Sequence, residues 1–206
     1  MRHDAYYEDE KVVLYCGRCE EILPTLSGIG AIVTDPPYEI NFAPCKEIPG
    51  CDRPFDPIQL IPYPKVVLWG ANHFADRLPP SNGWIVWDKR LHAQFENDFS
   101  DCEMAWTNLN VPTRMFRHLW TGLIKGSEFR DARYHPSQKP VALMSWILAR
   151  YTDPADLICD PYCGSGTTLV AAKKNEQKCI GIEIREEYCE ATAKRLSQGV
   201  LEFTHA

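Results

Sequence analysis

Short apolar runs alternate with polar or amphipathic segments along most of the chain. The runs are hydrophobic at nearly every position, which is typical of strands that are covered on both faces. They are residues 12–15, 31–34, 65–69, 84–87, 102–106, 157–159 and 178–182.

Three of the segments between or after these runs predict helices. After Pro140, which suits a first helical turn, apolar residues recur at helical spacing and form one face. They are Leu143, Met144, Ile147, Leu148 and Tyr151. Gly166 to about Asn175 and Glu186 to about Leu196 predict two more helices. Buried strands that alternate with helices predict an open, mostly parallel α/β sheet.

Residues 39–64 form a different kind of segment. They contain six prolines and scattered polar residues, which predicts a long loop and no regular element. A loop of this length inside a compact domain is usually functional or disordered. We therefore expect it to act as a mobile lid.

Asp35-Pro36-Pro37-Tyr38 follows the run 31–34, at the carboxyl end of a predicted strand. Ligands of open α/β sheets bind beyond these ends. The two prolines fix the backbone and remove two N–H donors, so the segment offers acceptors. It fits a pocket for a planar group with an NH2: Asp35 and the carbonyl of Pro36 accept its hydrogens, and Tyr38 stacks on its ring. The alternative is a rigid turn with a packed tyrosine.

A glycine-rich turn follows the run 157–159 and reads Asp160-Pro161-Tyr162-Cys163-Gly164-Ser165-Gly166-Thr167-Thr168. Glycine lets a ligand approach the backbone, and the N-terminus of the next helix offers N–H groups to an anion. The spacing is not that of a P-loop. Glu183 lies 19 residues after Gly164, where an acid can hydrogen-bond ribose hydroxyls. The combination predicts a nucleoside-cofactor site; an ordinary βαβ turn is the alternative.

A polar segment, His135-Pro136-Ser137-Gln138-Lys139-Pro140, leads into the first predicted helix. By itself it fits a capping loop. Because it precedes the glycine-rich turn, it also fits a source of polar groups for the carboxylate of a cofactor.

The formal net charge of the 206-residue chain is −6, but basic residues are concentrated in one stretch. Residues 111–150 carry seven Arg or Lys against two acids, so this stretch has a charge of +5 and the rest of the chain −11. The asymmetry suits a basic face for phosphates and an acidic back, although charge alone fits the following alternative equally well. A solvated surface helix is the alternative.

The composition, 45% hydrophobic and 24% charged, is sufficient for one globular core. No apolar run is long enough to span a membrane, and the polar start does not resemble a signal peptide. Nine cysteines without an export signal predict free thiols in the cytoplasm. Cys16 and Cys19 have zinc-ligand spacing, but the only second pair, Cys45 and Cys51, is looser. We expect no metal.

Together, the motifs resemble the β class of amino-group DNA methyltransferases, in which the catalytic motif precedes the cofactor motif. Residues 35–38 look like the catalytic Asp-Pro-Pro-Tyr of that family, and residues 135–140 like its His-Pro-Ser/Thr-Gln-Lys-Pro segment. Residues 160–168 are similar to its cofactor loop, with Tyr162 where phenylalanine is usual, and residues 180–183 look like its ribose-binding strand.

The resemblance covers roughly residues 12–197 and implies both a fold and a reaction. The fold is a single open, mostly parallel, seven-stranded Rossmann-like sheet of an S-adenosylmethionine-dependent methyltransferase, with helices on both faces and a circularly permuted motif order. The runs 84–87 and 102–106 are its reversed edge. Residues 1–206 are one methyltransferase domain, in which 39–64 are the lid and 107–134 a small target-recognition insertion.

The implied reaction is transfer of a methyl group from S-adenosylmethionine to the exocyclic amino group of a flipped base in double-stranded DNA. Asp at position 35, where Ser is the alternative, favours adenine N6 over cytosine N4. The catalytic residues are Asp35, Pro36, Pro37 and Tyr38. The cofactor residues are His135, Ser137, Gln138, Lys139, Asp160, Tyr162, Gly164, Ser165, Gly166, Thr167, Thr168 and Glu183. The DNA-binding residues are Arg114, Arg117, Lys125, Arg130 and Arg133.

Two features depart from the family pattern. Gly17-Arg18 stands where members commonly have Gly-Asp, so the contact to the cofactor's adenine passes to a neighbour such as Cys19 or Glu20. The short span between residues 38 and 135 leaves little room for a recognition domain, so either the basic stretch around 111–134 serves for recognition, or a partner or second subunit helps. A homodimer and a cognate restriction enzyme are open expectations. Other functions that stay open are a cytosine-N4 enzyme, an RNA or protein amino-methyltransferase, and a non-catalytic DNA-binding remnant.

Overall fold

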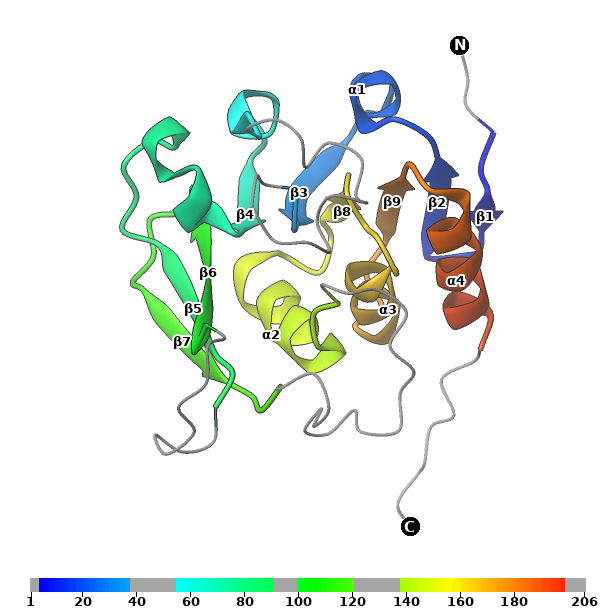
Figure 1. Ribbon diagram of the computed structural model, residues 1–206. Helices are drawn as coiled ribbons and strands as arrows, with labels where there is room; N and C mark the ends of the chain where they lie inside the picture. Colours follow the sequence, from blue (N-terminus) through cyan, green and yellow to red (C-terminus); the bar gives the residue numbers. More distant parts are fainter. Residues whose placement is uncertain (1–3, 38–54, 91–99, 121–137, 199–206) are drawn as a thin grey trace.

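One mixed sheet forms the centre of the protein (Figure 1). The computed structural model describes residues 4–37, 55–90, 100–120 and 138–198. Within these ranges the sheet has nine strands in the order β1-β2-β9-β8-β3-β4-β6-β5-β7. The strands are β1 Tyr7–Glu8, β2 Val12–Cys16, β3 Ile29–Thr34, β4 Lys65–Trp69, β5 Trp84–Asp88, β6 Cys102–Thr107, β7 Arg114–Arg117, β8 Leu157–Asp160 and β9 Cys179–Glu183.

The three predicted helices all form, as α2 Val141–Tyr151, α3 Thr167–Lys174 and α4 Glu186–Ser197. A short fourth helix, α1 Cys19–Ile22, was not predicted. Short 3-10 turns occur at Leu23–Thr25, Pro57–Gln59, Ala71–His73 and Ala75–Arg77. No helix in the described ranges has the length and apolarity that crossing a membrane requires.

All seven predicted runs are strands of this sheet, but the predicted strand number and edge need correction. β1 and β7 are additional; β1 has two residues and β7 begins and ends with arginine, so neither forms an apolar run. Of the two runs predicted as the reversed edge, only β6 is antiparallel to β4, because β5 pairs antiparallel with β6 and so regains the direction of the central strands.

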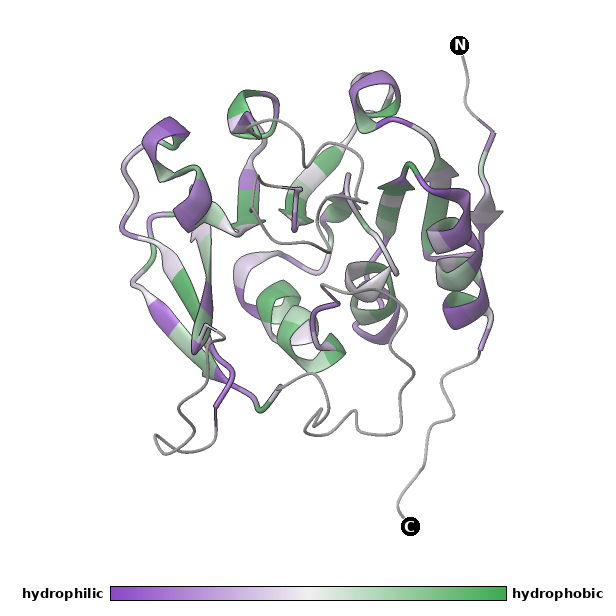
Figure 2. Cartoon of the chain, viewed as in Figure 1, coloured by the Kyte–Doolittle hydropathy of each residue, from purple (hydrophilic) through white to green (hydrophobic). Residues whose placement is uncertain are grey.

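Alternate residues of the central strands contribute to two apolar clusters, one on each face of the sheet. Ala31 and Val33 of β3 pack in the cluster that contains α2, α3 and α4. Ile32 packs on the other side with α1 and the 3-10 turns. Helices therefore cover both faces, but the second face carries only short ones. Figure 2 shows the result: apolar strands at the centre, a mostly apolar α2, and polar residues on much of α4.

The strand order reverses between β8 and β3. These strands are parallel neighbours, yet the chain continues from β8 through α3 to β9 and from β3 to β4, in opposite directions along the sheet. In open α/β sheets the crevice at such a switch point is where ligands bind. Asp160 ends β8 and Asp35 directly follows β3, so the fold brings the two predicted motifs together here.

Candidate active site

A pocket opens at the carboxyl ends of β3 and β8. It encloses about 430 Å³, including space that is open to solvent. Residues from three of the predicted motifs line it, together with one residue of α2. They are Asp35, Gln138, Lys139, Met144, Asp160, Tyr162, Cys163, Ser165, Thr167 and Thr168.

Asp160 joins the elements that surround this pocket. Its Oδ1 accepts hydrogen bonds from the Thr34 hydroxyl (2.6 Å) and from the backbone N–H of Tyr162 (3.2 Å). Its Oδ2 accepts one from the Thr168 hydroxyl on α3 (2.5 Å). Burial raises the pKa of Asp160 to about 6, although these hydrogen bonds oppose the shift. Asp160 thus fixes the start of the glycine-rich loop to β3 and α3.

The glycine-rich loop can adopt its path only with glycine at two positions. Gly164 and Gly166 have φ values of 52° and 73°, in the left-handed region that disfavours other residues. A Cβ on Gly166 would also lie 2.3 Å from Cγ2 of Thr192 on α4. Thr192 donates a hydrogen bond to the carbonyl of Gly164 (3.0 Å), and Arg195 donates one to the carbonyl of Ser165. α4 therefore holds the loop from behind.

Glu183 ends β9, beside this loop. It is buried, and its two carboxylate oxygens accept hydrogen bonds from the backbone N–H groups of Gly164 (2.9 Å) and Arg185 (2.8 Å). Burial raises its pKa. Each carboxylate oxygen has a second lone pair, so a rigidly held Glu183 can still accept hydrogen bonds from two ligand hydroxyls.

Asp35 lies at the other side of the pocket, in contact with Lys139. The Lys139 ammonium donates to Oδ2 at 2.5 Å, whereas Oδ1 is buried and has no hydrogen-bond partner among the described residues. Burial raises the pKa of Asp35, and the Lys139 charge opposes that shift. The site therefore holds one carboxylate oxygen in an ion pair and leaves the other for a donor.

Further charged groups extend from Lys139. Its ammonium lies 3.1 Å from Oε2 of Glu103, and Oε1 of Glu103 accepts from Lys89 at 3.1 Å. Burial acts to raise the pKa of Glu103, but the two lysines outweigh it, so the pKa is lowered. Burial lowers the pKa of His73, which also interacts with Asp35. The sequence alone assigns no role to Glu103, Lys89 or His73, although Glu103 is an isolated acid within an apolar run.

Several predicted site residues fall outside the described part of the chain. They are Tyr38, Lys125, Arg130, Arg133, His135 and Ser137, and with them residues 39–54 of the predicted lid. The structure does describe the end of the predicted lid, residues 55–64. Phe55 and Leu60 are buried, and the Phe55 ring packs edge-to-face with the Tyr162 ring, with centroids 5.8 Å apart. Phe55 and Leu60 therefore anchor this end of the predicted lid to the core beside the glycine-rich loop, while other residues of 55–64, such as Ile58, are exposed.

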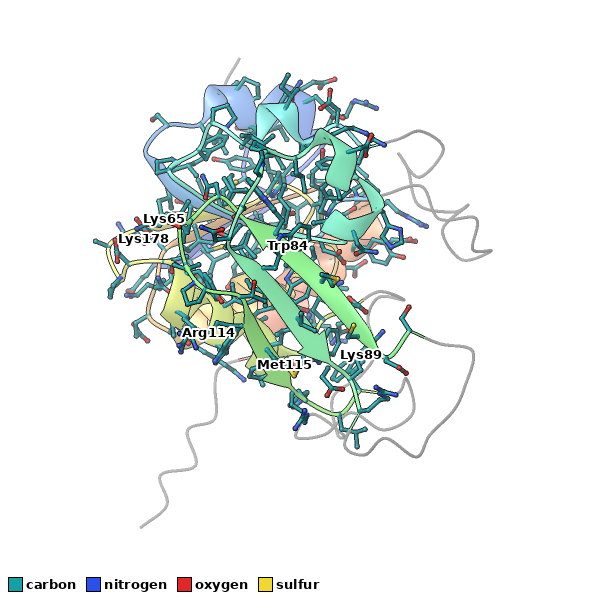
Figure 3. All side chains as sticks on the ribbon, turned by 90° about the vertical axis from the view of Figure 1, so that its left-hand side faces the viewer. Lys65, Trp84, Lys89, Arg114, Met115 and Lys178 are labelled. Atoms are coloured by element: carbon teal, nitrogen blue, oxygen red, sulfur yellow. The ribbon has the colours of Figure 1, made fainter. Side chains whose placement is uncertain are left out.

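Arg114 and Arg117 lie on β7, the strand at the edge of the sheet, where Figure 3 labels Arg114 and Met115. Both arginines are exposed. Arg117 pairs in register with Asp88 and donates a hydrogen bond to its carboxylate at 2.9 Å. Because Asp88 ends β5, Arg117 is on the same edge of the sheet as the pocket, and Arg114 is at the opposite end of the strand.

The structure also describes Arg18, which departs from the family pattern, and its neighbours. Arg18 is half exposed beside the acids of α1, with Nε 3.8 Å from carboxylate oxygens of both Glu20 and Glu21. Cys19 is buried, and burial raises its pKa to about 11. Across the described ranges, no three His, Cys, Asp or Glu side chains are grouped as metal ligands would be.

Comparison with known sequences identifies a family and several curated relatives. Residues 86–194 match the family model for N6/N4 methyltransferases, described as DNA methylase. The type II methyltransferase M2.LlaDCHI of Lactococcus lactis subsp. cremoris is 38% identical over 86 residues, which are 42% of this chain and 32% of that protein. M2.MboI of Moraxella bovis is 34% identical over 115 residues, 56% of this chain and 41% of that protein. The chain thus spans about a third of the length of such relatives.

Solved structures resemble nearly the whole chain. The M1.HpyAVI–SAM complex is 26% identical and has a TM-score of 0.58; the match covers 89% of this chain and 99% of that one. PvuII DNA methyltransferase (cytosine-N4-specific) has a TM-score of 0.65 over 94% of this chain and 89% of that one, at 15% identity, which supports the fold alone. The predicted Rossmann-like methyltransferase fold is confirmed.

Proposed function

The chain belongs to the N6/N4 family of DNA methylases, and on this premise we propose that it transfers a methyl group from S-adenosylmethionine to the exocyclic amino group of a base in double-stranded DNA. One observation carries the proposal. Asp35, with one oxygen available to a donor, lines the same pocket as the glycine-rich loop. A group that accepts hydrogens from an amine is thereby placed beside a site for a nucleoside cofactor.

The residues around the loop fit the cofactor. Glu183 offers lone pairs to the ribose hydroxyls, and the N-terminus of α3 offers N–H groups where Ser165 and Thr167 line the pocket. Gln138 and Lys139 line its other side, as the predicted cofactor segment requires, and Asp160 orders the loop. The cofactor supplies a methyl group on a positively charged sulfur, which leaves as a neutral thioether.

Asp35 and the backbone that follows it prepare the base for the reaction. The lone pair of an exocyclic amine is delocalised into the ring, so the amine is a weak nucleophile. Accepting its two hydrogens at Asp35 and at the carbonyl of Pro36 favours a tetrahedral nitrogen. As the new N–C bond forms, the nitrogen must lose one proton, and Oδ1 of Asp35 is the acceptor. Positioning alone can lower the barrier by about 7–11 kcal/mol.

The amino group of a paired base is inaccessible inside a duplex, so the base must flip into the pocket. We assign closure over that base to the predicted lid from residue 39 onwards and stacking on its ring to Tyr38. Phosphate or base contacts are assigned to Arg114 and Arg117 on β7 and to Lys125, Arg130 and Arg133. The activity requires no membrane and takes place in the cytoplasm, where the chromosome is. Residues 107–134 serve for target recognition, and a second subunit of a homodimer or another partner extends that small surface.

Adenine N6 is the proposed target because position 35 is Asp; cytosine N4 is the second candidate, since the same pocket accepts its amino group. Methyl-labelled S-adenosylmethionine should be incubated in parallel with duplex DNA, RNA and protein, and the labelled DNA digested to nucleosides for mass analysis. We expect N6-methyladenine. N4-methylcytosine would transfer the assignment to the second candidate, and label in RNA or protein alone would overturn the proposal.

A further inference from the structure

We propose that Lys139 and Glu103 are positioning residues for Asp35, in a chain of alternating charges that continues to Lys89. The inference rests on the proposed function, because Asp35 is the group whose orientation and ionisation the chain controls. Lys139 precedes α2, Glu103 is the second residue of β6, and Lys89 follows β5. Three separate parts of the fold therefore converge on one carboxylate.

The geometry distinguishes the two oxygens of Asp35. The Lys139 side chain is only 7% exposed, and its ammonium lies 2.5 Å from Oδ2 of Asp35 and 3.1 Å from Oε2 of Glu103. An ammonium held between two carboxylates is fixed in position, so it also fixes the rotation of the Asp35 carboxylate. Oδ1, which accepts no hydrogen bond from the described residues, is then the oxygen that meets the amine.

Aromatic rings on the central strands confine the two lysines further. The Lys139 ammonium lies 5.7 Å from the ring centroid of Trp69 and the Lys89 ammonium 5.8 Å from that of Trp87. The two rings pack edge-to-face with centroids 6.4 Å apart. Their faces attract the cations and exclude water from this side of the cluster, which strengthens the ion pairs.

The alternating charges have opposite effects on Asp35. The Lys139 cation favours the ionised carboxylate, whereas the Glu103 anion disfavours it. The other titratable groups that face Asp35 are His73 and Asp160 on β8. Burial lowers the pKa of the His73 imidazole. Lys139 thus favours the ionised form of a buried base, and Glu103 acts against it and so favours proton uptake by Asp35.

Two substitutions test the opposite effects, Lys139→Met and Glu103→Gln. The titration of Asp35 should be followed by NMR of isotope-labelled aspartate carboxyl groups, with Asp35→Asn to assign the signal. This readout needs no enzymatic activity, so it is independent of whether the proposed function holds. We expect Lys139→Met to move the titration to higher pH and Glu103→Gln to move it to lower pH. If Lys139 and Glu103 served folding alone, the two variants would not shift the Asp35 titration in opposite directions.

Turnover provides the second readout, provided that the wild type methylates DNA. Both variants should lower turnover by about tenfold or more, and the acid limb of the pH profile should move to higher pH for Lys139→Met and to lower pH for Glu103→Gln. Lys65→Met is the matched control, because Lys65 also bridges two carboxylates but lies at the amino end of β4; it should retain wild-type turnover and profile.

The inference is overturned if the Asp35 titration is the same in all variants, or if Lys65→Met loses as much turnover as Lys139→Met. It is also overturned if Lys139→Met weakens cofactor binding by calorimetry while the Asp35 titration stays unchanged, because Lys139 would then bind the cofactor only. Should Lys139→Met fail to fold, Glu103→Gln decides alone, since it keeps the shape of the side chain. A wild type without methyltransferase activity would contradict the proposed function but leave the NMR result to judge this inference.

Discussion

Two lysines in this protein each bridge a pair of carboxylates, at opposite ends of the central strands. Lys139 joins Asp35 and Glu103 at the carboxyl edge. Lys65, the first residue of β4, joins Asp153 and Asp156 at the amino edge, at 2.5 and 2.6 Å. Figure 3 shows Lys65 and Lys89 at opposite ends of the strands. Lys89 belongs to the same charged cluster as Lys139. The distances are similar, so distance does not separate a functional ion pair from a structural one.

The surroundings of the two lysines do differ. The side chain of Lys65 is 22% exposed and that of its partner Asp153 is 74% exposed. Solvent can therefore hydrogen-bond to the polar atoms that the ion pair leaves without a partner. Lys139 is 7% exposed, and Asp35 keeps a buried oxygen without a hydrogen bond from the described residues. An unsatisfied buried acceptor costs about 1–3 kcal/mol, and a ligand donor would recover this. The buried acceptor on Asp35, which also lines the pocket, and not the ion pair, therefore distinguishes the Lys139 cluster from the Lys65 cluster.

The largest expected difference between the two edges is in turnover. Asp35→Ala removes the proposed acceptor for the amine and should abolish methylation while cofactor binding largely survives. Asp156→Ala removes the equivalent partner of Lys65 and should leave turnover unchanged. Steady-state methylation of DNA measures both. If Asp35→Ala kept more than about a tenth of wild-type turnover, a loss of under ~1.4 kcal/mol, the catalytic assignment would be wrong.

Two glycines with left-handed backbones allow a comparison of packing. Gly28, at the amino edge before β3, has φ 75° and nothing within 4 Å of an added Cβ, whereas a Cβ on Gly166 would collide with Thr192. Gly28→Ala should cost about 1–2 kcal/mol of unfolding free energy, from backbone strain alone. Gly166→Ala should cost about 1–3 kcal/mol more, because overpacking adds to the strain. Urea denaturation compares them, and equal losses would mean that α4 yields to the new methyl group.

Glu183 and Asp9 are carboxylates that each accept two backbone N–H groups, Glu183 at the carboxyl edge and Asp9 at the amino edge. Glu183→Ala should weaken S-adenosylmethionine binding by about 1.5–3 kcal/mol, the usual value of charge-assisted hydrogen bonds. Asp9→Ala should lower stability without changing cofactor affinity. Calorimetry with both variants measures the affinities; an unchanged value for Glu183→Ala would remove it from the cofactor site.

The smallest expected effects are in the pH dependence of stability, and they have opposite signs at the two edges. Burial raises the pKa of Asp160 to about 6, so the folded protein keeps a proton that the unfolded chain releases, and stability falls as pH rises from about 4 to about 6. The pKa of Asp9 is lowered to about 2, where hydrogen bonds from Lys173 and neighbouring groups outweigh burial. Its contribution is therefore present above about pH 4 and is lost as pH falls towards 2.

The variants Asp160→Asn and Asp9→Asn separate the two contributions. Asp160→Asn should gain stability relative to the wild type between pH 4 and pH 6, by on the order of 1 kcal/mol per pH unit. Asp9→Asn should lose stability relative to the wild type at pH 7, and the loss should shrink towards pH 2. Unfolding free energies from urea titrations across this pH range provide the measurement. Changes of the same sign in both variants would contradict the assigned burial of Asp160.

The sequence by itself determined the core of the sheet, the order of its motifs and the family. Strands buried on both faces need apolar residues at every position, so β3, β4 and β8 were visible as runs. The glycines of the cofactor loop were equally visible, because local backbone geometry requires them. β1 and β7 lacked this signal: edge strands need neither length nor a continuous apolar run.

Only the tertiary structure decided which charged residues meet. Asp35, Glu103 and Lys139 come from distant parts of the chain, and no local pattern encodes their proximity. The reversed β6 places Glu103 at the carboxyl edge, whereas a strand in the other direction would have placed it at the amino edge beside Lys65. Strand direction follows from long-range pairing, and so the functional difference between two similar lysines arises from topology.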